Sequence, residues 1–178
     1  MPRVDYVPVD ISEPADLVAA IRARRGGQLL NLDRMLMHSP ALARGWNTYM
    51  GAVRTQLSVS PRLREIGICV VAVLNGAEYE FIHHAPELLA AGGSQAQVDA
   101  LRDPQSAAKD TSLFDDTERA TIVLTIDMTR SVKVSEGLIE SLTKAIGSQA
   151  TVELVAAIAA YNMVSRLLIA LGVEPESH

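Results

Sequence analysis

Apolar residues recur every three or four positions along most of this chain, which is the spacing of one buried face of an α-helix. Glycine-containing pairs at 26–27, 75–76 and 92–93 each follow such a segment, as expected where a helix ends in a left-handed residue. No segment alternates apolar and polar residues with period two over a useful length, so strands are not expected. The pattern predicts an all-α fold.

The helical segments are separated by short polar breaks and by Ser-Pro pairs that suit the start of a new helix. Ser94 and Gln97 have the spacing of a capping box, and Pro86 is expected to kink the helix that contains it. Between these helices we expect an irregular arm over residues 4–14 and a polar linker over 102–112. The predicted helices cover residues 16–25, 29–38, 41–57, 61–74, 77–91, 94–101, 115–129, 135–146 and 151–171.

Composition fits one compact domain: the chain has 178 residues, 48% of them hydrophobic and only 4% aromatic. We expect an N-terminal arm at 1–14, a single helical-bundle domain at 15–174 and a tail at 175–178. Aliphatic richness with few aromatics favours helices packed through small side chains over a β-sandwich.

Charge and cysteine content limit the binding partners and the cellular compartment that we expect for the protein. The net charge of -5 argues against nucleic-acid binding, which needs clustered Lys and Arg. The single cysteine, Cys69, fits a reducing compartment, and residues 1–14 lack the apolar core of an export signal, so we expect a cytoplasmic protein. The apolar stretch 152–171 contains Glu153, Asn162 and Arg166, which favours a core or subunit-interface helix over a membrane span.

The candidate chemistry lies at residues 77–84, Ala-Glu-Tyr-Glu-Phe-Ile-His-His, which crowd carboxylates, a phenol and two imidazoles onto one short helix. Glu80 and His84 are four residues apart, so they face the same side of that helix and can share a proton. Glu65 lies in the first turn of the preceding apolar helix, and a tight turn at 75–76 would fold the two helices together. The alternative for each residue is a structural role, as a surface pair or a helix-end charge.

A metal site is the less favoured interpretation of the same cluster. Glu80 and His83 have the Glu-x-x-His spacing of di-iron bundles, but those proteins need a second such motif and two further glutamates. A zinc site would need a third ligand, and His38 is the only other internal histidine. We therefore expect no metal and no cofactor.

The arrangement of these residues resembles the carboxymuconolactone decarboxylase and alkylhydroperoxidase D superfamily. The similar order covers roughly residues 41–100: Arg64-Glu65, an apolar helix, a short break, a Glu-Tyr-Glu run at 78–80, and His84. The segments 161–166 and 171–174 also resemble this group. The resemblance implies an all-α fold in which an antiparallel helical hairpin carries the site, and a homo-oligomer, commonly a trimer or hexamer.

Two branches of that superfamily differ at the positions that matter here. The thiol peroxidase branch has a C-x-x-C pair, and this chain has Ala77 and Glu80 at those positions, with Tyr79 where another histidine often stands. Without both thiols, peroxide reduction lacks its nucleophile, and Cys69 lies in the wrong helix. The decarboxylase branch is more similar, because it has a glutamate four residues before the histidine and needs no sulfur.

The preferred hypothesis is a cofactor-independent lyase or isomerase that acts on a small carboxylated or lactone-like metabolite by acid–base chemistry. Arg166 would hold a substrate carboxylate or form an ion pair with an acid such as Glu65. The alternatives are a peroxidase-like oxidoreductase that uses Cys69 or a metal, and a catalytically silent binding or assembly protein. The candidate residues are Glu65, Tyr79, Glu80 and His84 for catalysis, and Asn162 and Arg166 for substrate binding.

Overall fold

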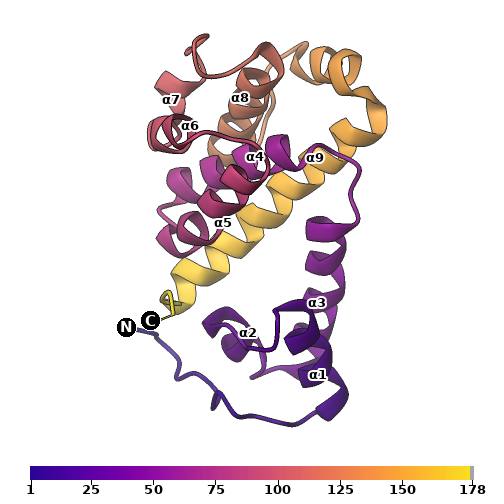
Figure 1. The fold of residues 1–178 in the computed structure, drawn as a ribbon, viewed down its shortest axis with the longest axis vertical. Helices are drawn as coiled ribbons and strands as arrows, with labels where there is room; N and C mark the ends of the chain where they lie inside the picture. The colour runs from indigo at the N-terminus through magenta and orange to yellow at the C-terminus, as the bar shows by residue number, and fades with distance from the viewer. Residues whose placement is uncertain (177–178) are drawn as a thin grey trace. The chain divides into compact units, whose positions relative to one another are not determined.

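The computed structural model describes residues 1–176, and within that range all regular structure is helical (Figure 1). The all-α prediction is confirmed. The chain forms two compact units, one from Met1–Gln56 together with the end of the chain from Leu167, the other from Leu57–Arg166. Part of the predicted tail at 175–178 lies outside the described residues.

The first unit consists of the N-terminal arm, three helices and the end of the last helix. The arm is irregular, as expected, and is bound by backbone and side-chain contacts: the Arg3 amide donates to Leu171 O at 2.8 Å, and Arg34 Nε donates to Val7 O at 2.8 Å. The helices of this unit are α1 (Ala15–Arg24), α2 (Asn31–Leu36) and α3 (Pro40–Thr55).

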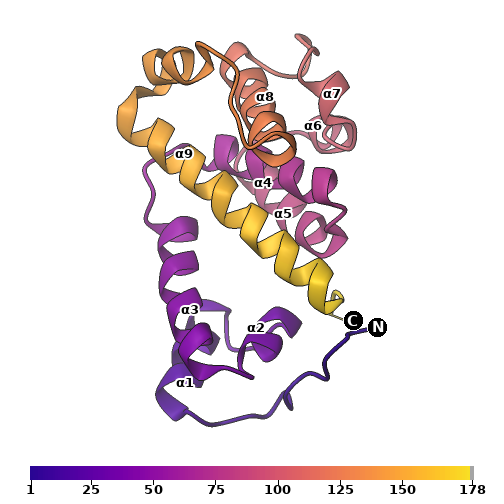
Figure 2. The same ribbon diagram turned by 180° about the vertical axis from the view of Figure 1, so that it is seen from behind.

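The second unit is built around α4, whose residues from Ile66 to Ala72 are all buried. Figures 1 and 2 show α9 running beside α4 and α5 on one side, with α8 on another. Gly67 makes the close approach to α9 possible, because a Cβ at this position would lie 3.2 Å from Ile158 Cγ1. The helices of this unit are α4 (Pro61–Asn75), α5 (Glu78–Ala90), α6 (Gln95–Ala100), α7 (Pro104–Ala107), α8 (Asp116–Arg130) and most of α9 (Leu138–Leu171).

A two-residue connection folds α5 back along α4. Gly76 has φ 68°, the left-handed conformation that glycine adopts at little cost, and the Ala77 amide donates to Ala72 O at 2.8 Å. The two helices therefore form an antiparallel hairpin, which brings the first turn of α4 opposite the middle of α5.

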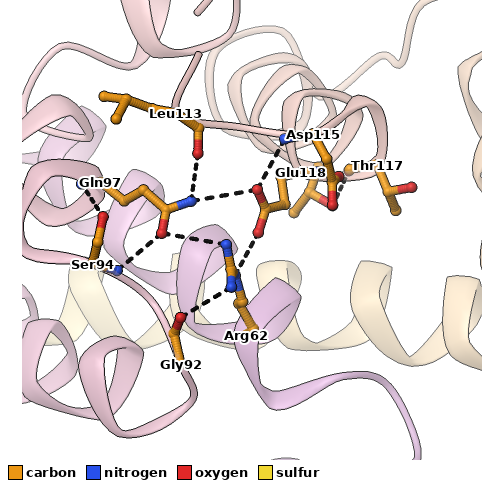
Figure 3. Close-up of polar contacts among 9 residues, drawn as sticks. Arg62, Gly92, Ser94, Gln97, Leu113, Asp115, Thr117 and Glu118 are labelled. Carbon is orange, nitrogen blue, oxygen red and sulfur yellow. Dashed lines mark hydrogen bonds and ion pairs between the residues drawn. The ribbon is translucent and has the colours of Figure 1, made fainter. Parts of the chain in front are cut away.

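A polar network ties the start of α4 to α6 and α8 (Figure 3). Arg62 forms an ion pair with the buried carboxylate of Glu118 and donates to Gly92 O at 3.0 Å. The Gln97 side chain accepts from the Ser94 amide at 3.0 Å and donates to Leu113 O at 2.7 Å. The capping box predicted at Ser94 and Gln97 is thus present, and its glutamine also joins two further elements.

Several predicted boundaries need correction. The polar linker at 102–112 contains the short helix α7, because Asp103 caps it through the Ser106 amide (3.3 Å) and Pro104 occupies its first position. The helix expected at 29–38 is shorter, at Asn31–Leu36. The helix expected at 77–91 is present as Glu78–Ala90, with Pro86 inside it as expected. The last two predicted helices are both present as the two parts of α9, which begins at Leu138 and is broken where expected, at Gly147 (φ 82°, ψ 162°).

By length and composition α9 could cross a membrane, a property that the core helices of soluble proteins share. In the second unit its face toward α4 is buried and apolar: Leu154, Ala157, Ile158 and Tyr161 are at most 2% exposed.

The contact between α4 and α9 predicts a strong size limit at position 67. Gly67→Leu should lower the free energy of unfolding by about 1–3 kcal/mol, because the added side chain overlaps Ile158 in a packed core. Denaturant unfolding of the variant measures this loss. Gly45 is a helical glycine at which an added Cβ would meet no atom within 4 Å, so Gly45→Leu should cause no comparable loss. Equal stability of the two variants would contradict close packing at Gly67.

Candidate functional site

The centre of the candidate site is a buried contact between Glu65 on α4 and His84 on α5. His84 Nδ1 lies 2.6 Å from Glu65 Oε2, and the two residues are each 4% exposed. Arg64 Nε donates to the other oxygen, Glu65 Oε1, at 3.1 Å. Since a carboxylate oxygen accepts, Nδ1 carries the proton, and the contact fixes the tautomer and the orientation of the imidazole. The sequence left open whether Glu65 reaches His84, and in the structure it does.

The Glu65 carboxylate is held in its ionised form. Burial alone would raise its pKa, but the hydrogen bond from His84 and the charges of His84 and Arg64 outweigh burial, so that the pKa of Glu65 is lowered. Glu65 therefore acts as a fixed negative charge behind the ring of His84.

Glu80 is buried as deeply as Glu65 but has no comparable partner. Its side chain is 2% exposed, and neither carboxylate oxygen has a hydrogen-bond partner among the described residues. Burial raises the pKa of Glu80 well above its ordinary value. Burial therefore favours the neutral carboxylic acid, which has one O–H donor and one acceptor oxygen.

The other buried acids show how unusual Glu80 is in this structure. Four acidic side chains within residues 1–176 are buried, and the remaining three are all paired. Asp33 contacts Arg24 and Arg25, Glu65 contacts Arg64 and His84, and Glu118 contacts Arg62. Buried polar groups are normally satisfied, so an unpartnered carboxyl group calls for a functional explanation.

The expected pairing of Glu80 with His84 is not made. The two residues are one turn apart on α5, but the His84 proton at Nδ1 goes to Glu65, and Glu80 makes no hydrogen bond among the described residues. The reason is the antiparallel packing of α4 against α5, which supplies an ionised and better-placed acceptor. The two carboxyl groups therefore have separate roles.

Two aromatic side chains contact the histidines. The Tyr161 ring meets the His84 ring edge to face, with centroids 4.7 Å apart, and Tyr161 is only 2% exposed. The Tyr79 ring stacks on His83 at 4.3 Å, and His83 Nδ1 lies 2.7 Å from Tyr79 O. Tyr79 thus lies on the side of α5 that carries His83, next to the side that carries His84. Tyr161 takes a place beside His84 that the spacing within 77–84 could not indicate, because it comes from α9.

Cys69 lies one turn after Glu65 on α4 and is fully buried. Burial, followed by the negative charge of Glu65, raises the pKa of its thiol far above the ordinary range. The thiol is therefore protonated and unreactive.

Asn162 and Arg166 belong to a different network. The buried Asn162 amide donates to Thr129 Oγ1 at 3.0 Å and accepts from Asn75 Nδ2 at 3.2 Å. Arg166 is exposed and donates to Asn162 O at 2.7 Å, one turn earlier on α9. Among the described residues Arg166 makes no ion pair, so the alternative of an ion pair with Glu65 is not seen. These contacts stabilise the junction of α4, α8 and α9.

Within residues 1–176 no three His, Cys, Asp or Glu side chains come together as a group that could hold a metal ion. The buried polar groups of the hairpin are the Arg64–Glu65–His84 chain and Glu80, which lies one turn before His84 on α5. This combination provides an oriented imidazole and a separate buried acid, the two kinds of group that general acid–base catalysis uses.

The fold and this hairpin define a class of all-helical proteins with known members. The model of the carboxymuconolactone decarboxylase family matches residues 40–123, which include the whole α4–α5 hairpin. Among curated proteins, none matches the chain.

Solved structures share the fold over nearly the whole chain. An uncharacterized peroxidase-related protein from a Silicibacter species has 16% identity and a TM-score of 0.82, covering 99% of this chain and 92% of its own. The alkylhydroperoxidase AhpD core of a peroxidase-related protein from Ralstonia eutropha has 16% identity and a TM-score of 0.81, covering 99% and 93%. A variant of the debrominase Bmp8 in complex with 2,3,4-tribromopyrrole has 18% identity and a TM-score of 0.79, covering 98% and 92%.

Residues 40–123 thus match the carboxymuconolactone decarboxylase family, and the chain as a whole has the fold of AhpD-like proteins. At these levels of identity the solved structures establish the fold and leave the chemistry to the residues of the site.

The unpartnered state of Glu80 predicts a specific pH dependence of stability. Its folded pKa is raised above the ordinary 4.5, so ionisation of the unfolded chain destabilises the native state as pH rises above that value. Glu80→Gln removes this effect. The stability of the variant relative to wild type should rise by up to about 1.4 kcal/mol per pH unit above pH 4.5, until the folded pKa is reached. Urea unfolding between pH 4 and 8 measures it, and a constant difference would contradict a buried neutral acid.

Glu65 should show the opposite dependence. Its folded pKa is lowered below the ordinary 4.5, so its stabilising effect is present above that pH and is lost as pH falls through the lower folded value. Glu65→Gln should therefore cost stability at pH 7, by about 1–3 kcal/mol, and much less near pH 3. Glu78→Gln, which changes an exposed ion pair with Arg102 on the same hairpin, is the control and should cost under about 1 kcal/mol. A loss at Glu65 that is independent of pH would contradict the ionised state.

Proposed function

We propose that the protein is a cofactor-independent lyase or isomerase of the carboxymuconolactone decarboxylase type, which acts on a small carboxylated or lactone-like metabolite by acid–base chemistry. The observation that carries the proposal is Glu80: both carboxyl oxygens are buried and unpartnered among the described residues, whereas the other buried acids are paired.

An unpartnered buried carboxyl group destabilises the native state, typically by about 1–3 kcal/mol. An apolar residue of similar size at position 80 would avoid this penalty. Sites that are retained against stability are typical of function. A carboxylic acid that stays neutral near pH 7 is suited to donate a proton.

The two carboxyl groups divide the chemistry between them. Glu65 is ionised and orients His84 through Nδ1, so the ring exchanges a proton through Nε2, in the manner of other carboxylate-oriented histidines. Glu80 is the proton donor. The separation of their ionisation states follows from their partners, because the two residues are buried to the same extent.

In the decarboxylation of a lactone acid, the bond between the ring and the carboxylate breaks and carbon dioxide leaves. The electron pair of that bond passes into the conjugated ring carbonyl as a dienolate. Glu80 gives its proton to the ring carbon, and His84 passes a proton from solvent to restore the acid. One carboxylate and one proton become carbon dioxide and a C–H bond, so no oxidant or metal is required.

A peroxidase-like oxidoreductase is the alternative that the fold relatives suggest, since two of them are peroxidase-related proteins and a third is a debrominase. A thiol-based route in this chain would have to use Cys69. The burial of Cys69 and the raised pKa of its thiol disfavour it. Assembly as a homo-oligomer and a cytoplasmic location are part of the proposal and await direct measurement.

Turnover of a panel of small unsaturated lactone acids, followed as carbon dioxide release, tests the function. Glu80→Gln and His84→Ala should each lower kcat by about 10²–10⁴-fold while far-UV circular dichroism shows a retained fold. Both changes remove a proton-transferring group and leave the hairpin in place.

Cys69→Ala is the matched control, because it alters a buried residue of the same hairpin and should leave kcat within a few-fold of wild type. Loss of activity in Cys69→Ala alone would favour the oxidoreductase alternative. Unchanged turnover in either Glu80→Gln or His84→Ala, or no release of carbon dioxide from any lactone acid by the wild-type protein, would overturn the proposal.

A further inference from the structure

The two carboxyl oxygens of Glu80 indicate which hydrogen-bonding groups a ligand at this position would need. Both oxygens are buried, and both lack a partner among the described residues. A neutral carboxyl group has an O–H donor on one oxygen and an acceptor on the other, about 2.2 Å apart by covalent geometry. A ligand that fills only one of these positions leaves the other unsatisfied, at a cost comparable to a lost hydrogen bond.

The neighbouring side chains do not complete either position. Glu65, the other buried acid of the hairpin, has both oxygens engaged, one by Arg64 and one by His84. Cys69 is a weak donor and a weak acceptor, and it makes no hydrogen bond to Glu80 in the described structure. Both positions of the Glu80 carboxyl group are therefore left to the ligand.

We propose that Glu80 recognises a ligand with a hydrogen-bond donor and an acceptor on adjacent positions of an uncharged ring, as a lactam or a hydroxyl group next to a carbonyl provides. This inference rests on the proposed function and narrows its substrate class, from lactone-like compounds in general to those with an N–H or O–H beside the carbonyl. Glu80 donates to the ring carbonyl and accepts from the adjacent N–H or O–H.

The charge of the surroundings favours an uncharged group at this point. A carboxylate there would find neither Arg64 nor Arg102 free to pair with it: Arg64 is engaged by Glu65, and Arg102 is engaged by Glu78 through two hydrogen bonds of 2.7 and 2.9 Å. An acidic part of the substrate would therefore lie away from Glu80. The paired donor and acceptor make the match specific, because each lost hydrogen bond leaves a buried group unsatisfied.

Three isosteric probes test the match, because they differ only at the atom next to the carbonyl: γ-butyrolactam has N–H, γ-butyrolactone has O, and N-methylbutyrolactam has N–CH₃. Dissociation constants are measured by NMR titration on the wild-type protein. The lactam should bind about tenfold more tightly than the lactone, because one net hydrogen bond contributes about that factor. Its advantage over the methylated lactam should be larger.

Two variants at position 80 separate recognition from catalysis. Glu80→Gln keeps a donor and an acceptor, so it should keep the preference for lactam while it loses turnover. Glu80→Leu keeps the size and removes both groups, so the preference should disappear. Glu78→Gln, two residues earlier on an exposed side of α5, should leave the preference unchanged.

Equal affinities of lactam and lactone for the wild-type protein, as expected if buried water satisfies Glu80, would overturn the inference. Persistence of the preference in Glu80→Leu would also overturn it. These readouts do not depend on turnover: a lactam preference without any decarboxylation refutes the proposed function alone, and turnover of lactone acids without a lactam preference refutes only this inference.

Discussion

The candidate site depends on the burial of α4. Every residue from Ile66 to Ala72 is buried, and Gly67 lets α9 approach where a side chain would collide. This apolar stretch offers no carboxylate or imidazole of its own, so polar chemistry on the hairpin is confined to the first turn of α4 and to α5. The tight turn at Gly76 then sets the register, which places Glu65 against His84 across the hairpin. If the packing of α4 changed, the oriented histidine would be lost with it.

The same burial acts on two carboxyl groups with opposite results. Glu65 and Glu80 are 4% and 2% exposed, so desolvation favours the neutral acid in each. Arg64 and His84 reverse that preference at Glu65, and no described residue does so at Glu80. Partner geometry rather than depth of burial therefore decides the ionisation state. A hairpin with one ionised and one neutral carboxyl group has the asymmetry that acid–base catalysis needs.

The sequence predicted the parts of this structure that depend on local physics. Glycine pairs, Ser-Pro starts and the Ser94 capping box located the helices, because these signals act within one or two turns. The spacing of Glu80 and His84 correctly placed both on α5, but it could not show that His84 would bond to Glu65, which depends on the register across the hairpin. Tyr161 comes from a helix distant in sequence, and the contact of Arg166 with Asn162 could not be read from the candidate roles of these residues. Such contacts are set by packing between helices, which one-dimensional spacing does not encode.

The position of Glu80 also explains how one hairpin can support two chemistries. By resemblance, Ala77 and Glu80 occupy the thiol positions of the peroxidase branch, whereas His84 is common to both branches. A thiolate nucleophile needs a pocket that lowers its pKa, yet burial here raises the pKa of Cys69 and of Glu80 alike. In such surroundings a thiol is inert, but a carboxyl group becomes a neutral acid that can still give up a proton. The environment that is unsuited to sulfur chemistry is therefore suited to proton transfer, so the loss of the thiols and the gain of Glu80 are physically consistent with each other.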